Sequence, residues 1–249
     1  MQVDRSQIIH DWLQTPLGAA LLRQEARVVE EALDGVFGEQ CLQLGLWGDS
    51  RTFMRFTRTQ RCSVVAETPL GGPSAIGDLH RLPIESDSID AVLMPHTLDY
   101  SERPHAVLRE VDRVLRRDGR LIILGFKPGG LWGLRRLIPG AGIPPGAEHL
   151  ISDRRLKDWL KLLDMRIEGN SRYFFRWPLP GNKARGSKKW EQRGKAWWPE
   201  LGACYMISAQ KRVSTLTPVR PLWRRNPQVV AGLAESQSRV SRIRFDENN

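Results

Sequence analysis

Residues 75–126 read AIGDLHRLPIESDSIDAVLMPHTLDYSERPHAVLREVDRVLRRDGRLIILGF, and this stretch decides the fold. It runs from an acidic loop into a short apolar strand over Ile89–Met94, an amphipathic helix over Pro104–Arg116 and a second apolar strand over Arg120–Leu124. The first strand is apolar along most of its length, which is typical of a strand buried on both faces. The helix has apolar residues at helical spacing, and an Asp-Gly turn ends it.

A strand–helix–strand unit of this length predicts a parallel sheet with a right-handed crossover. Ligands of such sheets bind beyond the carboxyl ends of the strands. The segment Met94-Pro95-His96-Thr97 follows the first of the two strands directly. We therefore expect Pro95 and His96 at the mouth of a binding site.

The motifs of this stretch, and their spacing, resemble those of a known enzyme class. They are Gly77-Asp78-Leu79, Leu82-Pro83, Asp87-Ser88-Ile89-Asp90, His96-Thr97-Leu98, Glu110, Arg113-Val114-Leu115 and Gly119-Arg120-Leu121. Together they resemble the central block of the class I S-adenosylmethionine-dependent methyltransferases, in the branch whose members act mostly on small molecules and lipids. The resemblance implies an α/β, Rossmann-like methyltransferase fold. Its sheet would be mostly parallel with an antiparallel last strand, and its cofactor would be S-adenosyl-L-methionine.

The first strand and the glycine loop of that class are present in altered form. Cys41–Gly45 reads as a strand that runs into a turn, and Gly45 is predicted to bind cofactor because the backbone must approach the ligand closely there. The class usually has an acid on this strand and a Gly-x-Gly-x-Gly loop after it. This chain has Gln43 and then Gly45-Leu46-Trp47-Gly48-Asp49. Gln43 cannot be an anionic partner for the cofactor's ammonium group, and Trp47 either packs away from the pocket or narrows it.

The next strand, Arg61–Glu67, ends in an acid. The resemblance implies that Glu67 holds the ribose hydroxyls, since a carboxylate accepts hydrogen bonds from two vicinal hydroxyls at once. It further implies that Asp78 and Leu79 read the adenine. The alternative for both acids is an ordinary solvated loop or turn position. Prolines and glycines within 68–73 leave no room for the helix that usually follows, so we expect a trimmed sheet edge.

Methyl transfer from a sulfonium is an in-line displacement, so alignment of the nucleophile with the methyl carbon supplies much of the acceleration. A general base is needed only where the acceptor is protonated at neutral pH. His96 is the candidate catalytic residue, because it follows a strand at the expected site and titrates near neutrality. The alternative is a hydrogen-bonded histidine that lines the pocket and contacts cofactor. Weaker candidates for the base are Asp99, Tyr100 and His149.

The remaining segments are assigned by the same patterns. Residues 1–35 are predicted to be a helical N-terminal extension with a helix start at Thr15-Pro16, and residues 36–211 the methyltransferase domain. Residues 212–249 are predicted to be a basic, disordered tail. The late elements of the domain are expected at Leu131–Ile138 (helix), Arg154–Leu163 (helix), Met165–Ile167, Tyr173–Trp177 and Leu201–Lys211 (strands).

The chain is strongly basic, with a formal net charge of +10 and a pI near 10.1. Lysines, arginines and tryptophans alternate in an insertion over residues 178–200. This pattern suits an anionic membrane surface, where tryptophan prefers the interface, or nucleic acid, where rings stack on bases. The alternative is a solvated insertion whose tryptophans cap the core. The tail offers a second cationic segment for such a polyanionic partner.

Composition favours a cytoplasmic enzyme-sized domain of 249 residues. No apolar run approaches the ~20 residues that span a bilayer. The three cysteines are far apart, two of them on strands predicted to be buried (Cys41 and Cys62), and no metal-ligand spacing is present. The absence of a nucleophile triad, a phosphate loop and a Gly-x-Gly-x-x-Gly pattern disfavours hydrolases, kinases and nicotinamide dehydrogenases. A non-catalytic binding protein on the methyltransferase scaffold is the second hypothesis.

Overall fold

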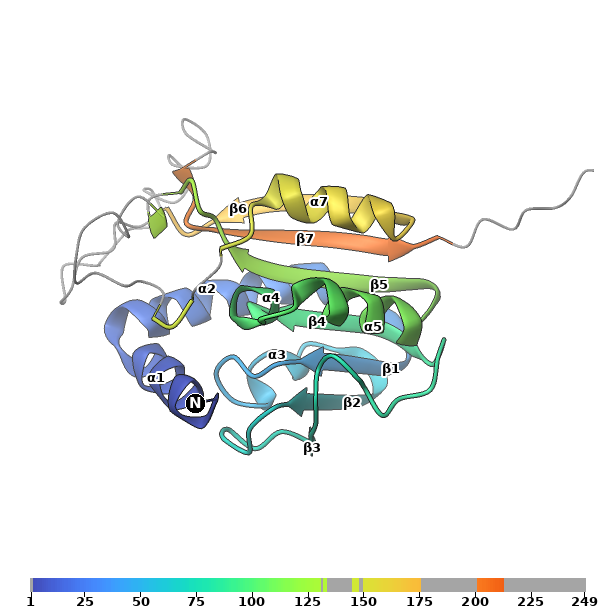
Figure 1. Cartoon of the computed structure of the whole chain (residues 1–249), viewed down its shortest axis with the longest axis horizontal. Coiled ribbons are helices and arrows are strands. Elements are labelled where there is room, and N and C mark those ends of the chain that lie inside the picture. Colours follow the sequence, from blue (N-terminus) through green and yellow to red (C-terminus); the bar gives the residue numbers. More distant parts are fainter. Residues whose placement is uncertain (1, 131, 134–144, 148–149, 176–200, 213–249) are drawn as a thin grey trace, which may run out of the picture. The chain divides into compact units, whose positions relative to one another are not determined.

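The computed structural model describes residues 2–130, 132–133, 145–147, 150–175 and 201–212, and every structural statement below concerns these residues. They form a seven-stranded sheet with helices on both faces (Figure 1). The strands are β1 (Phe37–Leu44), β2 (Arg58–Ala66), β3 (Ala75–Ile76), β4 (Ile89–Pro95), β5 (Leu115–Phe126), β6 (Met165–Tyr173) and β7 (Cys204–Lys211).

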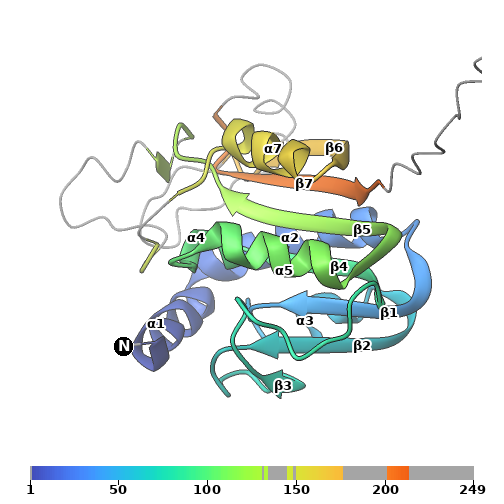
Figure 2. The same cartoon turned by 45° about the vertical axis from the view of Figure 1, so that its right-hand side comes forward.

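The strands are ordered β3-β2-β1-β4-β5-β7-β6 across the sheet. β1 pairs in parallel with β2 and β4, β2 with β3, and β4 with β5, whereas β7 is antiparallel to both β5 and β6. The predicted Rossmann-like α/β fold, mostly parallel with an antiparallel last strand, is confirmed. The parallel strands end at one side of the sheet (Figures 1 and 2), so the loops that leave them meet there.

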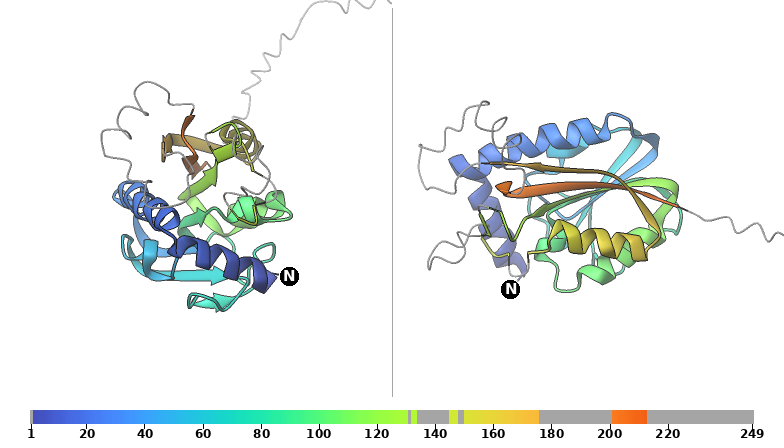
Figure 3. Two further views of the ribbon diagram at one scale, coloured as in Figure 1. Left: turned by 90° about the vertical axis from the view of Figure 1, so that its left-hand side faces the viewer. Right: turned by 90° about the horizontal axis from the view of Figure 1, so that it is seen from above.

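The helices form a layer on each face of the sheet. Seen from above, α2 lies on one side of the sheet and α5 and α7 on the other (Figure 3). No helix among the described residues is both long enough and apolar enough to cross a membrane. The helices are α1 (Gln2–Gln14), α2 (Pro16–Leu33), α3 (Arg51–Met54), α4 (Thr97–Tyr100), α5 (Pro104–Val114) and α7 (Asp153–Leu162).

Two hydrophobic clusters sit on opposite faces of the sheet, and the central strands contribute alternate residues to each. Val92 and Met94 of β4 join the cluster beneath α5 and α7, whereas Ala91 and Leu93 join the cluster beneath α2. Successive side chains of a strand point to opposite faces, so a strand covered on both faces has to be apolar at every position. This explains the uninterrupted apolar run on which the fold prediction rests.

The N-terminal residues form the predicted helices, and the first of them, α1, lies where the parallel strands end (Figure 1). Thr15 caps α2, accepting a hydrogen bond from the Gly18 amide through Oγ1 at 3.2 Å, and Pro16 follows at the first helical position. The helix start predicted from Thr15-Pro16 is thereby confirmed. α1 lies beside the carboxyl ends of β1 and β2 (Figures 1 and 2), and it reaches the site described below.

The segment after β2 has the trimmed edge that its prolines and glycines predict. Residues 67–74 are bends and turns, and the edge strand β3 has only two residues. Cys62 corrects another expectation, because it is exposed rather than buried. It lies in the first part of β2, which is largely exposed, whereas Val64–Ala66 at the end of the strand are buried. Cys41 is buried, as predicted.

The boundary between α5 and β5 was predicted too late in the chain. α5 ends at Val114, and Leu115 already pairs with Ile89 of β4. The next pair is Ala91 with Arg120, so the Asp-Gly turn lies within β5, as a bulge, rather than before it. Asp118 has a φ of 59°, the left-handed conformation typical of such a position. The turn signal was correctly read, but tertiary pairing starts the strand before it.

The late elements differ from prediction mainly in the strands. The strand expected at Met165–Ile167 continues to Tyr173 as β6, with a register shift between Ile167 and Gly169. Of the strand expected at Tyr173–Trp177, only Tyr173 lies in β6; Phe174 and Phe175 are in no strand, and residues 176–177 lie outside the described residues. The last strand begins at Cys204 rather than Leu201, and the helix α7 is capped by Ser152 as its sequence indicates. Of the helix expected at Leu131–Ile138, residues 132–133 are helical, and the rest lies outside the described residues. The insertion 178–200 lies outside them too, as does the tail 212–249 apart from its first residue.

Candidate active site

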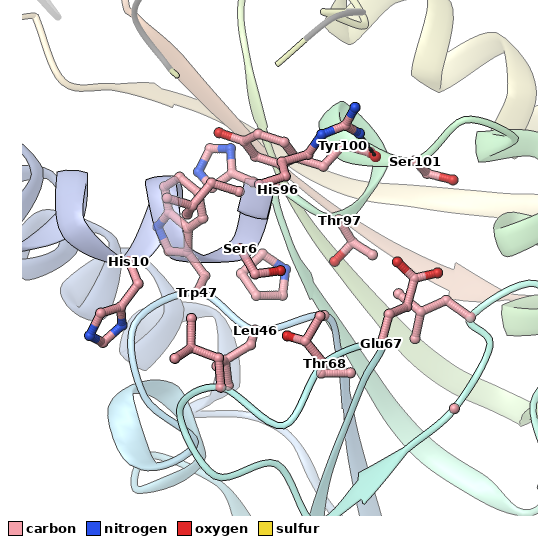
Figure 4. A pocket seen from close by; sticks show the side chains of 18 of the residues that line it. Ser6, His10, Leu46, Trp47, Glu67, Thr68, His96, Thr97, Tyr100 and Ser101 are labelled. Atoms are coloured by element: carbon pink, nitrogen blue, oxygen red, sulfur yellow. Dashed lines mark hydrogen bonds between the residues drawn. The ribbon is translucent and has the colours of Figure 1, made fainter. Parts of the chain in front are cut away.

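A cavity of about 520 Å³ opens where the parallel strands end, which is within the size range of small-molecule sites. Its walls come from the loops after β1, β2, β3 and β4, and from one side of α1 (Figure 4). The structure brings all six residues predicted to bind cofactor into the lining of this one cavity. They are Gly45, Glu67, Asp78, Leu79, Pro95 and His96. Their individual roles stay predictions.

Gly45 is the point at which the loop after β1 touches the end of β4. Its φ is +78°, and a Cβ at this position would lie 2.8 Å from the Oγ1 atom of Thr97. Thr97 Oγ1 in turn donates to the carbonyl of Leu44. Both the backbone conformation and the close approach therefore require glycine. The retained glycine of the altered loop is needed by the packing of the cavity floor.

Trp47 is buried, and it forms part of the cavity wall rather than packing away from the cavity. Its side chain is 1% exposed, and its Nε1 donates to Glu25 Oε2 at 2.6 Å. The surrounding rings belong to Trp12, His96, Tyr100 and Phe126. Asp49 is turned to the start of α3, where its carboxylate accepts from the amide of Arg51. Neither residue closes the cavity, which is open beside the altered loop (Figure 4).

Gln43 occupies the position at which the class usually has an acid. Its side chain is fully buried, and its Nε2 donates to the carbonyl of Gly45 at 3.0 Å. Its Oε1 accepts no hydrogen bond from the described residues. The side-chain amide of Gln43 thus holds the loop by donating to a backbone carbonyl. An ionised carboxylate has no hydrogen to donate and could not make this bond.

The two acids predicted to hold the nucleoside lie close together in the cavity lining. Glu67 follows β2, and burial raises the pKa of its carboxyl group. Asp78 Oδ1 accepts from the backbone amide of His80 at 2.8 Å and lies 2.7 Å from its Nδ1, and these hydrogen bonds lower the pKa of Asp78. One ligand atom of each of these three residues lies within 4.8 Å of the others. The arrangement offers carboxylate acceptors for hydroxyl and amino groups at one end of the cavity.

His96 is held between two carboxylates. Its Nε2 lies 2.6 Å from Glu25 Oε1, and its Nδ1 lies 3.1 Å from Asp99 Oδ2. The imidazole is fully buried and stacks on Phe126 with a centroid distance of 3.9 Å. Burial by itself would lower the pKa of His96, but Glu25 and Asp99 outweigh it and raise the pKa to about 9. At neutral pH the ring therefore carries a proton on each nitrogen.

This geometry does not favour His96 as the general base that the sequence suggested, because a charged imidazole with both nitrogens engaged has no lone pair to offer. It matches the alternative, a hydrogen-bonded histidine of the pocket wall. Asp99 is buried and accepts from the Phe126 amide at 2.9 Å. The Tyr100 hydroxyl donates to the carbonyl of Pro145 at 3.2 Å, and burial raises its pKa well above the usual value. His149 lies outside the described residues.

Sequence reasoning missed Glu25, and it assigned no residue of α1 to the site. The α1 residues that line the cavity are Arg5, Ser6, Ile9, His10 and Leu13. Glu25 carried a signal that went unused, since Leu21, Glu25 and Val29 are spaced by four residues on one stripe of α2, and all three are buried. A lone acid on an apolar helical stripe indicates a buried polar partner.

The comparisons with known proteins agree with this architecture. Residues 56–123 match the family model described as a methyltransferase domain. The uncharacterized protein YafS of Escherichia coli K12 is 39% identical over 137 residues, which are 55% of this chain and 54% of YafS. Malonyl-[acyl-carrier protein] O-methyltransferase of Laribacter hongkongensis is 40% identical over 73 residues, 29% of this chain and 24% of that protein. The chain thus matches about half of the first relative's length and about a quarter of the second's.

Among solved structures, a SAM-dependent methyltransferase from Archaeoglobus fulgidus superposes with a TM-score of 0.56, covering 77% of this chain and 94% of that chain at 15% identity. A likeness at that identity concerns the fold. It joins the strand order, the position of the cavity and the family model in one conclusion: the described residues have the Rossmann-like fold of the S-adenosylmethionine-dependent methyltransferases, and residues 56–123 match a methyltransferase domain.

Proposed function

We propose that this protein transfers a methyl group from S-adenosylmethionine to a small-molecule or lipid acceptor. The observation that carries the proposal is the open cavity of about 520 Å³, around which Gly45, Glu67 and Asp78 gather from three different loops. The family model over residues 56–123 supports the same reaction class. The altered glycine loop is compatible with this reaction, because the buried Trp47 leaves the cavity open.

The donor set fits the cofactor. Glu67 would accept from the ribose hydroxyls, and Asp78 would accept from the adenine amino group through the oxygen atom that His80 does not engage. The backbone of Gly45 would approach the methionine part, since no side chain stands in the way. When bound, the cofactor supplies an electrophilic methyl group on a sulfonium. The protein would supply orientation, and α1 would keep water away from the cavity.

Proton removal by His96 has no place in this proposal, because both of its nitrogens face carboxylates. We propose instead that alignment of the acceptor atom supplies the main part of the acceleration. The acceptor would enter beside α1, where Ser6 and His10 offer polar groups and Ile9 and Leu13 offer apolar surface. Such a mixed wall suits a small molecule or a lipid. The relative named malonyl-[acyl-carrier protein] O-methyltransferase supports an acceptor bearing an acyl group.

The second candidate is a non-catalytic protein that binds an anionic membrane or nucleic acid through residues 178–198 and the tail 212–249. Its support is the sequence of these segments and the net charge of +10. The insertion carries lysines and arginines and the tail carries arginines, so salt would screen the binding. Nothing in the described residues adds to this candidate. Cytoplasmic localisation likewise stays a prediction.

The test uses S-adenosylmethionine carrying a tritiated methyl group. The full chain is incubated with it and a bacterial extract, and the label is then counted in the aqueous and lipid fractions. We expect label in one fraction, and loss of that label with Glu67→Ala/Asp78→Ala. Glu85→Ala, an exposed loop acid away from the cavity lining, serves as the matched control and should keep the activity.

Transfer that is equal in the wild type and the double variant would contradict the proposed site. The absence of transfer to either fraction, together with sedimentation of the full chain with anionic vesicles or with nucleic acid, would favour the non-catalytic candidate. High salt should abolish that sedimentation but leave methyl transfer in place.

A further inference from the structure

Glu25 is a fully buried carboxylate in the middle of α2, a helix of the N-terminal extension. Acids are almost never fully buried unless they are paired, because removing their charge from water costs roughly several kcal/mol. Glu25 has three partners: Trp47 at 2.6 Å and His96 at 2.6 Å, with the Tyr173 hydroxyl at 3.3 Å. These partners belong to the loop after β1, the turn after β4 and the strand β6.

The contact with Trp47 fixes the loop that forms the floor of the cavity. Trp47 stands where the class has the second glycine of its loop, so its side chain must be accommodated away from the ligand. Rings surround it, and its N–H would have no acceptor among them. Glu25 Oε2 supplies that acceptor. The carboxylate therefore sets the direction of the Trp47 side chain and, through it, the path of the backbone between Gly45 and Gly48.

The contact with His96 fixes the turn after β4, which adjoins Trp47. His96 has a φ of 56°, a left-handed conformation that is costly for a residue with a side chain. Glu25 and Asp99 hold its ring from both sides, and Phe126 stacks on its face. Because Pro95 and His96 both line the cavity, the backbone at this turn is part of the ligand site. Glu25 thus reaches both loops that flank the same end of the cavity.

We propose that Glu25 is the positioning residue of the cofactor cavity: one carboxylate holds the loop after β1 through Trp47 and the turn after β4 through His96. This inference rests on the proposed function and deepens it. The class usually obtains the backbone path of this loop with glycines. In this chain, Glu25 of α2 holds the loop in that path through its hydrogen bond with Trp47. The N-terminal extension is then a part of the cofactor site rather than a cover packed against it.

The charged and titratable groups that face His96 are Glu25 from α2, Asp99 and Tyr100 from α4, Tyr173 from β6 and Cys204 from β7. Replacing Glu25 by glutamine keeps the shape but changes the hydrogen bonding. A glutamine can turn its Oε1 toward either the Trp47 Nε1–H or the His96 Nε2–H, and its NH₂ group, which only donates, then faces the other. We expect the NH₂ group to face His96. His96 then has to give up a proton or lose this partner.

The experiment compares Glu25→Gln with Glu30→Gln, the same exchange at an exposed position of the same helix. Three quantities are measured on the full chain: the affinity for S-adenosylhomocysteine by calorimetry, the hydrogen exchange of residues 45–50 and 95–98, and the imidazole titration of His96 by NMR. For Glu25→Gln we expect at least tenfold weaker binding, at least tenfold faster exchange in both segments, and a His96 that titrates at lower pH. Glu30→Gln should match the wild type in all three.

The second and third measurements need no ligand, so they decide the inference even if the wild type binds no S-adenosylhomocysteine, a result that would overturn the proposed function alone. Exchange and His96 titration identical in Glu25→Gln and Glu30→Gln would overturn the inference. If Glu25→Gln does not fold, Trp47→Phe takes its place, because it removes the N–H donor and keeps a smaller aromatic ring. Faster exchange confined to residues 45–50 would support the inference, and unchanged exchange there would overturn it.

Discussion

Single residues shape the floor of the cavity through backbone conformation as much as through side chains. Gly45 has a φ of +78° and Gly72 a φ of +68°, so both adopt a conformation that L-residues avoid. They differ in surroundings. A Cβ on Gly45 would lie 2.8 Å from Thr97 Oγ1, whereas one on Gly72 would have nothing within 4 Å. Alanine substitutions at these two glycines therefore separate two contributions to the free energy of unfolding: the left-handed backbone conformation and the steric conflict of an added Cβ.

Gly45→Ala should therefore destabilise the protein more than Gly72→Ala. The left-handed conformation costs about 1–2 kcal/mol for a residue with a Cβ, and only Gly45→Ala adds a steric conflict at the cavity floor. Urea unfolding monitored by circular dichroism measures both. Equal free energies of unfolding for the two variants would mean that the contact between Gly45 and Thr97 is not as tight as the structure has it.

Glu67 carries a testable charge effect. Substitution by glutamine keeps the size of the side chain but weakens acceptance from two hydroxyls, which should lower the affinity for S-adenosylhomocysteine by about 1–3 kcal/mol, roughly 5- to 150-fold. Burial raises the pKa of Glu67 above its ordinary value of 4.5. Protonation of Glu67 should weaken binding of S-adenosylhomocysteine by the wild type as the pH is lowered. Because the pKa is raised, this weakening should begin at a higher pH than it would for a glutamate with the ordinary pKa.

Calorimetric titrations over a series of pH values check both statements, with Glu85→Gln as an exposed control. An affinity that is the same in Glu67→Gln and the wild type would remove Glu67 from the ribose site.

At the scale of elements, the buried group of Glu25, His96 and Asp99 joins α2, α4 and the end of β5. Asp99 accepts from the amide of Phe126 at 2.9 Å, and His96 bridges it to Glu25 across 71 positions of sequence. Burial raises the pKa of Asp99 in spite of these partners. The group therefore ties the N-terminal helices to the centre of the sheet by one protonated ring.

This group predicts how stability depends on pH. The pKa of His96 is raised from 6.5 in the unfolded chain to about 9 in the fold, so its contribution is fully present below pH 6.5 and is lost as the pH rises through 9. Urea unfolding at pH values between 6 and 9.5 should show a free energy of unfolding that decreases upward. His96→Gln should flatten this decrease, while His105→Gln, at an exposed position of α5, should not.

A stability that is constant from pH 6 to 9.5 in the wild type would show that His96 is not charged in the fold. The same titration therefore also tests the argument against His96 as a general base.

At the scale of the whole molecule, patterns with short-range causes were readable from the sequence. The nearly uninterrupted apolar run predicted the buried strand at Ile89–Met94, and the dipeptide Thr15-Pro16 predicted the start of α2. The middle of the edge strand β6 was not predicted, because polar residues alternate along this half-exposed strand. Burial of β1, β4 and β5 on both faces left no such ambiguity.

The candidate site divides in the same way. The six predicted cofactor residues follow strands or sit in loops at fixed spacing, and the parallel sheet brings them to one cavity. The lone acid on an apolar stripe of α2 could have indicated that Glu25 is buried, but its partners could not be predicted, because Trp47 and His96 are 22 and 71 positions away. His96 was found, but its two carboxylate partners, which decide its charge, belong to the fold rather than to the motif.

The most direct test of the account is calorimetric titration of the full chain with S-adenosylhomocysteine, supported by a thermal-shift measurement. A ligand that binds only the folded state raises the melting temperature, and the rise grows with the logarithm of the ligand concentration above Kd. The account predicts a one-to-one isotherm and a raised melting temperature, both diminished in Glu67→Gln. No heat and no thermal shift at millimolar ligand would contradict it.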